Sequence, residues 1–313
     1  MTLPIDARRY FGLEQPARIR AQLDIHLSEH CFAPTPEEPE ADWLASVATP
    51  AFRILARTGP RRSFLSIGTG CGLGAVEILG AEQVAVTDIF EDIVQAAALN
   101  FVANLAPGVT VPLTARTGDL VAPLADSGLR FDLVYENLPN TPVADAGQLA
   151  RGQTVAGFLA PRAEEVPPLL KDRLLVLHYL ALRQVRPLLN PGGAVLSTIG
   201  ARIPLDSFAA LAEAAGYRGR LLTYGWKKQA APEEYIPGYI AMEREGLGPF
   251  HFYRADTLRA AFAGLAPEEA GAAALAIEQD LKPHSLTATE ALAAHRAGEA
   301  VGHAVVALLS EAA

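Results

Sequence analysis

Cysteine, basic charge and long apolar runs are all scarce in this chain. It has two cysteines in 313 residues, Cys31 and Cys71, which are too few for a disulfide framework or a four-thiolate metal site. Lys and Arg together number 26 against 35 Asp and Glu, giving a net charge of −9, so a phosphate-tracking surface is electrostatically opposed. These scarcities exclude a disulfide-stabilised scaffold and predict no nucleic-acid partner.

Apolar segments are short although apolar residues are plentiful. No run approaches the roughly 18 residues that span a bilayer. The start MTLPIDARRY carries charge where a signal peptide needs an apolar stretch, so we expect a cytoplasmic protein in a reducing compartment, with no membrane partner. Half of the residues are hydrophobic and the mean hydropathy is +0.18, which is enough apolar material for a large core.

The pattern changes twice along the chain. In residues 1–58, apolar positions such as Leu23, Ile25 and Leu27, and later Trp43 to Leu55, favour an N-terminal helical cap. Residues 59–254 alternate short apolar runs with helical stretches, which is typical of an α/β fold with a parallel sheet and crossover helices. Residues 255–313 are Ala-rich and predict a C-terminal helical extension.

Seven strands are expected in the middle segment. Their ranges are 63–67, 83–87, 109–114, 131–135, 194–199, 220–224 and 250–253. Helices are expected at 72–79, 91–105, 169–188 and 205–215. The long connections at 138–168 and 225–249 are expected to be functional covers.

A glycine-rich turn follows the first of these strands directly. Gly68, Gly70 and Gly72 would let a ligand approach the backbone at the start of the next helix. Asp88 follows Gly68 by 20 positions and closes the next strand, where a carboxylate can accept hydrogen bonds from ribose hydroxyls. The alternative is a tight turn without a ligand and an ordinary helix-capping acid. No Gly-Lys-Ser/Thr follows, which excludes a P-loop.

Four blocks in order carry a resemblance to a known family. They are residues 68–72 (GTGCG), 87–89 (TDI), 118–120 (GDL) and 131–140 (FDLVYENLPN). Together they resemble the class I S-adenosylmethionine-dependent methyltransferases. The resemblance implies S-adenosylmethionine as cofactor and a seven-stranded Rossmann-like sheet closed by a hairpin at residues 220–253.

The resemblance also assigns parts of the cofactor to residues. Gly68 and Gly70 would approach the methionine part, Asp88 would hold the ribose, and Asp119 would contact the adenine amine. Gly72, Ile89 and Leu120 belong to the same predicted cofactor site. Ser66 stands where many members of the family have an acid, so its contact to the cofactor's amino group would be neutral.

The fourth block ends in Asn-Leu-Pro-Asn, similar to the Asn-Pro-Pro-Tyr motif of N-methyltransferases. Asn137 and Pro139 match, whereas Leu138 and Asn140 do not. We expect Asn137 and Asn140 to position the acceptor; alternatively they satisfy backbone groups of the loop. Tyr179 is a candidate for orienting the sulfonium through its ring, with core packing as the alternative.

Other residues near the N-terminus are open to two interpretations. Tyr10, Phe11 and Arg18 could close over the site or simply pack against helices. His26 and His30 are four residues apart, but no third ligand is near, so no metal site is predicted.

Three functions are compatible with these residues. The first is methyl transfer to a nitrogen or oxygen of a small-molecule or amino-acid substrate, with residues 226–250 forming the acceptor pocket. The second follows from a resemblance to the methyltransferase-like azetidine-2-carboxylate synthases: the cofactor is the substrate, and its own amine attacks its γ-carbon, with Asn140 and Tyr179 as positioning groups. The third is a cofactor-binding scaffold whose Ala-rich tail could form a homodimer.

Overall fold

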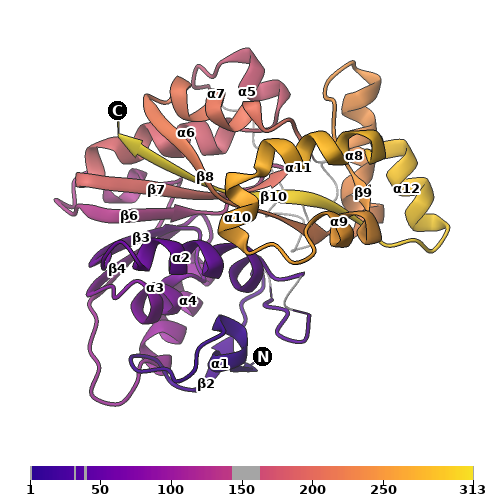
Figure 1. Ribbon diagram of the computed structural model, residues 1–313. Coiled ribbons are helices and arrows are strands. Elements are labelled where there is room, and N and C mark those ends of the chain that lie inside the picture. Colours follow the sequence, from indigo (N-terminus) through magenta and orange to yellow (C-terminus); the bar gives the residue numbers. More distant parts are fainter. Residues whose placement is uncertain (1, 32, 39–40, 143–162, 313) are drawn as a thin grey trace. The chain divides into compact units, whose positions relative to one another are not determined.

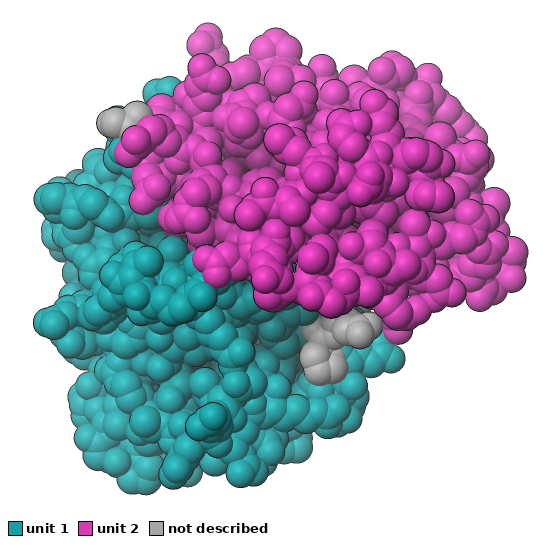
Figure 2. Space-filling view, viewed as in Figure 1, with its two compact units in different colours: residues 1–137, 181–196, 312 teal, residues 138–180, 197–311, 313 magenta. Residues whose placement is uncertain are grey.

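The computed structural model describes residues 2–31, 33–38, 41–142 and 163–312. The chain divides into two compact units, which Figure 2 shows in teal and magenta. The first consists of Met1–Asn137, Ala181–Leu196 and Ala312, and the second of Leu138–Leu180, Ser197–Glu311 and Ala313. The segment boundaries predicted at residues 58 and 254 stay predictions.

The first unit begins with a small antiparallel sheet rather than a helix. Strand β1 (Thr2–Asp6) pairs with β2 (Gln22–His26), and helix α1 (Ala7–Phe11) lies between them in the chain. The helical prediction for residues 22–26 is wrong because Leu23 and Ile25 are two apart, which is the period of a strand.

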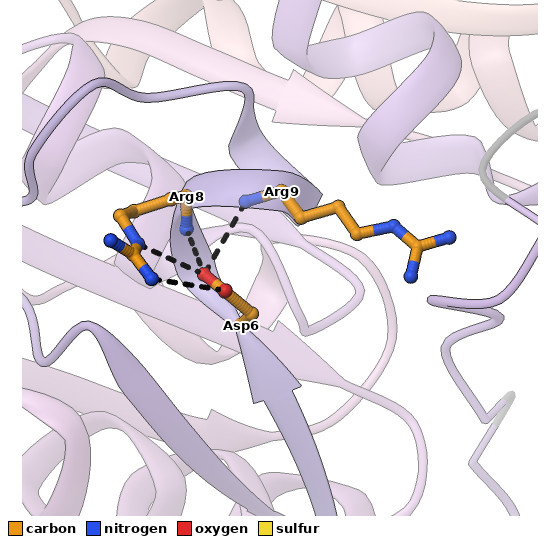
Figure 3. Close-up of polar contacts among 3 residues, drawn as sticks. All are labelled: Asp6, Arg8 and Arg9. Carbon is orange, nitrogen blue, oxygen red and sulfur yellow. Dashed lines mark hydrogen bonds and ion pairs between the residues drawn. The ribbon is translucent and has the colours of Figure 1, made fainter.

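The change from β1 to α1 is made by a side-chain cap, drawn in Figure 3. Asp6 Oδ1 accepts hydrogen bonds from Arg8 N at 2.9 Å and Arg9 N at 3.4 Å. These bonds satisfy two of the amide groups that the first turn of a helix leaves without partners. The Arg8 side chain also bonds the Asp6 carboxylate, and this bond is the largest cause that lowers the pKa of Asp6.

The second half of the N-terminal segment is helical, as predicted. A π-helical turn, η2 (Leu44–Ala48), leads into α2 (Thr49–Ala56). Phe52 of α2 is fully buried and makes edge-to-face ring contacts with Phe64 at 5.8 Å and Tyr135 at 5.5 Å. The helix is thereby fixed against the strands that carry those two rings.

The sheet of the first unit is parallel where its register is defined. Its strands lie in the order β5-β4-β3-β6, followed by β7, and the pairs β3–β4, β3–β6 and β4–β5 are parallel. Helices α3 and α4 connect β3 to β4 and β4 to β5, as in Rossmann-like folds. The elements are β3 (Ser63–Ile67), α3 (Gly72–Ile78), β4 (Gln83–Asp88), α4 (Glu91–Asn104), β5 (Leu113–Thr117), η3 (Ala122–Leu124), β6 (Phe131–Glu136) and β7 (Leu189–Ala201).

The second unit contains the last part of β7 and most of the later elements. Its strands lie in the order β7-β10-β8, and β9 pairs antiparallel with β10 (Figure 1). The elements from residue 168 on, apart from β7, are α5 (Pro168–Asp172), α6 (Val176–Val185, whose second half belongs to the first unit), η6 (Arg186–Leu188, in the first unit), α7 (Asp206–Ala214), β8 (Tyr217–Lys228), α8 (Pro232–Arg244), β9 (Tyr253–Arg254), α9 (Ala255–Ala261), α10 (Pro267–Ala272), α11 (Ala274–Leu281), η7 (Lys282–His284), α12 (Ala288–Arg296) and β10 (Val301–Ala312).

Strand β10 corrects the predicted end of the chain. Residues 255–296 are mainly helical as expected, but Val301–Ala312 is a strand. The hairpin predicted at 220–253 does not close the sheet, because the strand next to β8 in the strand order is β10. The 72 residues 229–300 separate these two strands in the chain. Strands buried on both faces contain a nearly continuous apolar run, as β10 does from Ala304 to Leu309. The periodicity of such a run does not distinguish a strand from a buried helix.

The α/β fold class is confirmed by the parallel strands, their crossover helices and the strand order. Among the residues described, no helix combines the length and the apolar character that a membrane span requires.

Val306 tests the position of β10. Its side chain is fully buried, so Val306→Asp would bury a carboxylate without a partner, which typically destabilises a fold by several kcal/mol. We expect V306D to lose the cooperative thermal transition of the wild type in circular dichroism. The matched control is Glu311→Gln at the exposed end of the same strand, which should melt like the wild type. A V306D protein that melts like its control would contradict the burial of β10.

Candidate functional site

The turn after β3 leaves its backbone open. Gly68 has φ 80° and Gly70 has φ 109°, backbone conformations that residues with a side chain rarely adopt. No atom lies within 4 Å of the position that a Cβ would take at either glycine. Gly68 N donates to Thr87 O at 2.7 Å, which fixes the turn to the end of β4. The main chain is therefore uncovered at these two glycines, and binding of a ligand there stays a prediction.

Gly72 has a different environment. It is buried at the start of α3, and a Cβ there would lie 3.1 Å from the ring of Phe101 on α4. The absence of a side chain lets these two helices pack closely, so the structure accounts for Gly72 through packing rather than through an open approach.

Asp88 lies half-buried at the carboxyl end of β4. Its Oδ1 accepts a hydrogen bond from Phe90 N at 3.0 Å. Burial raises the pKa of Asp88, opposed by the backbone N–H groups of Phe90 and Ile89. The side chain of Ile89 is 63% exposed, which is unusual for so apolar a residue. A carboxylate and an open apolar surface therefore follow one strand.

The loop after β5 is tied to Asp88 and has a strained backbone. Gly118 N donates to Asp88 O at 2.8 Å, and a Cβ on Gly118 would lie 2.4 Å from Pro123 Cγ. Leu120 is buried with φ 47°, a left-handed conformation that costs about 1–2 kcal/mol for a residue with a side chain. Asp119 lies half-buried between them. Strain of this kind occurs often at functional positions.

Ser66 lies inside the sheet. Its side chain is completely buried, and its Oγ has no hydrogen-bond partner among the described residues. It pairs in register with Val86 of β4 and Tyr135 of β6. The structure places Ser66 two residues before the open turn but within the core.

The N-terminal residues considered as a lid pack against other parts of the first unit. The Tyr10 hydroxyl donates to Asp42 Oδ1 at 2.8 Å, and both side chains are buried. Phe11 is buried, and its ring lies 3.2 Å from where a Cβ of Gly74 would be. Arg18 Nη1 donates to the backbone oxygen of Val76 at 2.9 Å. Packing is therefore the correct interpretation for these residues.

Cys71, inside the glycine turn, is also buried. Burial raises the pKa of its thiol to about 12, so the thiolate is not populated at neutral pH. This cysteine packs within the core.

The histidine pair does not form a metal site. His26 is on strand β2, so the two histidines do not share a helical face; His30 Nδ1 lies 3.0 Å from Asp92 Oδ1, and its ring stacks on Phe90 at 4.7 Å. Within the described parts of the chain, no group of three His, Cys, Asp or Glu residues could hold a metal ion.

Asn140 and Tyr179 lie in the second unit, whereas Asn137 lies in the first, directly after β6. Asn137 is exposed. Asn140 is 9% exposed, its Nδ2 donates to Gly200 O at 2.8 Å, and its backbone oxygen accepts from the Tyr239 hydroxyl at 3.2 Å. Tyr179 on α6 is 8% exposed. Of the loop predicted at 138–168, residues 143–162 lie outside the described residues.

Arg202 is a residue that the sequence analysis missed. It directly follows β7 and is 5% exposed. Its Nε and Nη2 donate to Gln229 Oε1 at 3.1 and 2.8 Å. The guanidinium lies over the rings of Tyr239 at 5.4 Å and Phe252 at 5.9 Å, and burial lowers the pKa of Arg202. The available signal was its position just after a strand, beside the glycine at 200.

Arg202 and Asn140 approach the same point. A Cβ on Gly200 would lie 2.5 Å from Arg202 Nη1 and 3.3 Å from Asn140 Oδ1. Glycine at this position keeps a hydrogen-bond donor and an acceptor clear of any side chain between them. The predicted acceptor pocket at 226–250 is largely the end of β8, Gln229 directly after it, and helix α8, which carries Tyr239.

No protein-family model matches the chain, and no curated protein matches it. Among solved structures, it is similar to the ribosomal protein L11 methylase of Lactobacillus delbrueckii subsp. bulgaricus, with 20% identity, 60% of this chain and 74% of that chain covered, and a TM-score of 0.36. A TehB-like S-adenosylmethionine-dependent methyltransferase of Corynebacterium glutamicum has 19% identity over 56% and 76%, with a TM-score of 0.34. An S-adenosylmethionine-dependent methyltransferase of Geobacter sulfurreducens, in complex with S-adenosylhomocysteine, has 16% identity over 88% and 91%, with a TM-score of 0.38. Because all three scores lie below 0.5, we base no conclusion on them.

The buried carboxyl of Asp88 predicts a pH effect on stability. Because its pKa in the folded protein is raised above the ordinary value of 3.8, the folded state binds more protons than the unfolded state, and stability falls as the pH rises from about 4. Asp88→Asn removes this effect and keeps an oxygen for Phe90 N. We expect the melting temperature of D88N to exceed that of the wild type by more at pH 7 than at pH 4.

The matched control for Asp88→Asn is Asp126→Asn on an exposed turn, whose difference from the wild type should not change with pH in this way. A D88N difference that is constant between the two pH values, or larger at pH 4, would contradict the burial of a charged Asp88.

Proposed function

We propose that this chain is an S-adenosylmethionine-dependent enzyme that transfers a methyl group to a nitrogen or oxygen of a small-molecule or amino-acid substrate. The observation that carries the proposal is the open glycine turn at Gly68 and Gly70, tied through Thr87 and Asp88 to the strained loop at Gly118. Three consecutive strand ends are connected around one exposed stretch of main chain.

The residues present fit this cofactor. The open space over Gly68 and Gly70 would admit the methionine part against the backbone. Asp88 would accept hydrogen bonds from the ribose hydroxyls, and the exposed side chain of Ile89 would contact the adenine. Asp119 would bind the adenine amine, with Leu120 fixing the loop that carries it.

The chemistry that the cofactor supplies is a methyl group on a positively charged sulfur, which is already a strong electrophile. The protein then has to bring the acceptor into line and exclude water. Asn140 suits this role because its Nδ2 is fixed by Gly200 O, whereas none of the described residues bonds its Oδ1. The ring of Tyr179, in the same unit, is proposed to act with it, and a role for Asn137 in positioning the acceptor stays a prediction.

One observation favours a second reaction, intramolecular cyclisation of S-adenosylmethionine. Ser66 is neutral and buried, so no carboxylate at this position would hold the amine as an unreactive ammonium. In this reaction the amine nitrogen bonds to the γ-carbon and the γ-carbon–sulfur bond breaks, its electron pair passing to sulfur. A proton is lost from nitrogen to solvent, and the products are azetidine-2-carboxylate and methylthioadenosine.

Incubation with S-adenosylmethionine alone, followed by mass spectrometry, separates these reactions. For methyl transfer we expect no turnover until acceptors are added, and then S-adenosylhomocysteine with a methylated product. If S-adenosylmethionine alone yields methylthioadenosine and a cyclic imino acid, the reaction is cyclisation and not methyl transfer. Tight binding without any turnover would instead indicate a cofactor-binding scaffold.

Calorimetry with Asp88→Asn accompanies this assay. We expect D88N to bind S-adenosylmethionine at least roughly tenfold more weakly, about 1.4 kcal/mol, because the amide cannot accept two ribose hydroxyls as a carboxylate can. Unchanged affinity would contradict the cofactor site.

Asn140→Ala tests the acceptor role in the second unit. We expect kcat to fall roughly tenfold or more while the Kd for S-adenosylmethionine changes less than threefold, because Asn140 is proposed to orient the acceptor. The neighbouring Thr141→Ala serves as the control, with little effect on either quantity. If N140A reduces kcat, cofactor affinity and melting temperature together, Asn140 has a structural role instead.

A further inference from the structure

We propose that Arg202 binds the carboxylate of an amino-acid ligand, at a subsite formed with Asn140 beside Gly200 in the second unit. This inference deepens the proposed function and rests on it, because it names the chemical class of the molecule that the enzyme positions.

The charge of Arg202 is buried without a charged partner in the part of the chain that the structure describes. Its side chain is 5% exposed, and no carboxylate of the described residues forms an ion pair with it. Its neighbours are the neutral amide of Gln229 and the rings of Tyr239 and Phe252. Buried charges in proteins are usually paired, so a guanidinium with only neutral partners is suited to an anion that arrives with a ligand.

Gln229 fixes the direction of the Arg202 guanidinium. Gln229 Oε1 accepts from both Nε and Nη2, and Gln229 Nε2 donates to Ala230 O at 2.8 Å, so the amide is fixed in turn. The side chain of Tyr239 forms a further hydrogen bond with the guanidinium. Nη1 lies beside Gly200, 2.5 Å from where a Cβ there would be. Any side chain at position 200 would occupy the space next to it.

Asn140 places a hydrogen-bond acceptor near Gly200, close to the guanidinium donor. Asn140 Oδ1 lies 3.3 Å from the same virtual Cβ and can accept a hydrogen bond. An α-amino acid carries a carboxylate and an amine one carbon apart, which match a cationic donor and a neutral acceptor. The electrostatic surroundings agree, since the pKa of His303 is lowered by burial and then by Arg202 and Lys227.

The carboxylate could come from either of two molecules. It could belong to an amino-acid acceptor, or to the methionine part of S-adenosylmethionine itself. Both have the same chemistry at Arg202, and they differ in whether the cofactor or a second ligand loses affinity when the guanidinium is removed.

The experiment compares Arg202→Met with the wild type in two binding assays. Calorimetry with S-adenosylmethionine and with decarboxylated S-adenosylmethionine measures the preference for the cofactor's carboxylate. Thermal shift with each of the twenty common L-amino acids and the corresponding amino-acid amides, with and without S-adenosylhomocysteine, measures the preference for a carboxylate on a second ligand.

One of these preferences should be at least roughly tenfold in the wild type and absent in R202M. A preference lost in the first assay identifies the cofactor's carboxylate, and one lost in the second identifies an acceptor. Since the thermal-shift assay is also run without S-adenosylhomocysteine, it reports on Arg202 even if the protein binds no cofactor, and failure of the proposed function is then seen separately.

A second variant guards against a misfolded R202M. Gln229→Glu is nearly isosteric and would give Arg202 an internal carboxylate, so we expect it to fold and to lose the same preference. Arg220→Met, at an exposed position on β8, is the matched control and should keep it. The proposal is overturned if the wild type shows neither preference, or if Q229E retains the wild-type preference in full.

Discussion

The parallel register of β3 with β4 and β6 is the constraint on which the candidate cofactor site depends. Ile67 pairs with Thr87 on one side and with Glu136 on the other, so the chain leaves all three strands at the same level. Gly68, Asp88 and Asn137 are the residues that follow or end these strands. Main-chain hydrogen bonds between the strands thus bring residues distant in the sequence to one edge of the sheet, where Gly68 offers its open backbone and Asp88 and Asn137 offer polar side chains.

The two units contain buried or half-buried polar groups of opposite charge. In the first, the half-buried group at the strand end is a carboxylate whose pKa is raised by burial, suited to accepting hydrogen bonds from hydroxyls. In the second, the buried group is a guanidinium between two rings and an amide. Each is destabilised by burial while it is charged, and each would gain most from a ligand that supplies the missing partner.

Local patterns were enough to predict the parallel strands and the residues at their ends. The apolar run at 63–67 followed by glycines, and the run ending at Asp88, are contiguous in sequence and correctly placed. Strand β5 was predicted at 109–114 but occupies Leu113–Thr117, because residues in this edge strand are half-exposed and its apolar pattern is weak.

The failures concern interactions between distant segments. The subsite at Arg202 depends on Gln229, Tyr239 and Phe252, which come from three later segments, and no local pattern records their convergence. Strand β10 contains the continuous apolar run from Ala304 to Leu309, so whether it forms a helix or a strand is decided by the partners it finds in the sheet. Likewise, the burial of Ser66 in β3 and the packing role of Gly72 at the start of α3 follow from neighbouring strands and helices rather than from the glycine turn between them.

The place of β10 in the strand order has a consequence for biosynthesis. This strand lies between β7 and β8, yet the ribosome makes it after both of them and after the six intervening helical elements α8, α9, α10, α11, η7 and α12. Until it emerges, the facing edges of β7 and β8 lack their partner, and exposed edges of this kind promote aggregation. In the nascent chain, the main-chain groups on those two edges are therefore open to other chains until residues 301–312 have been made.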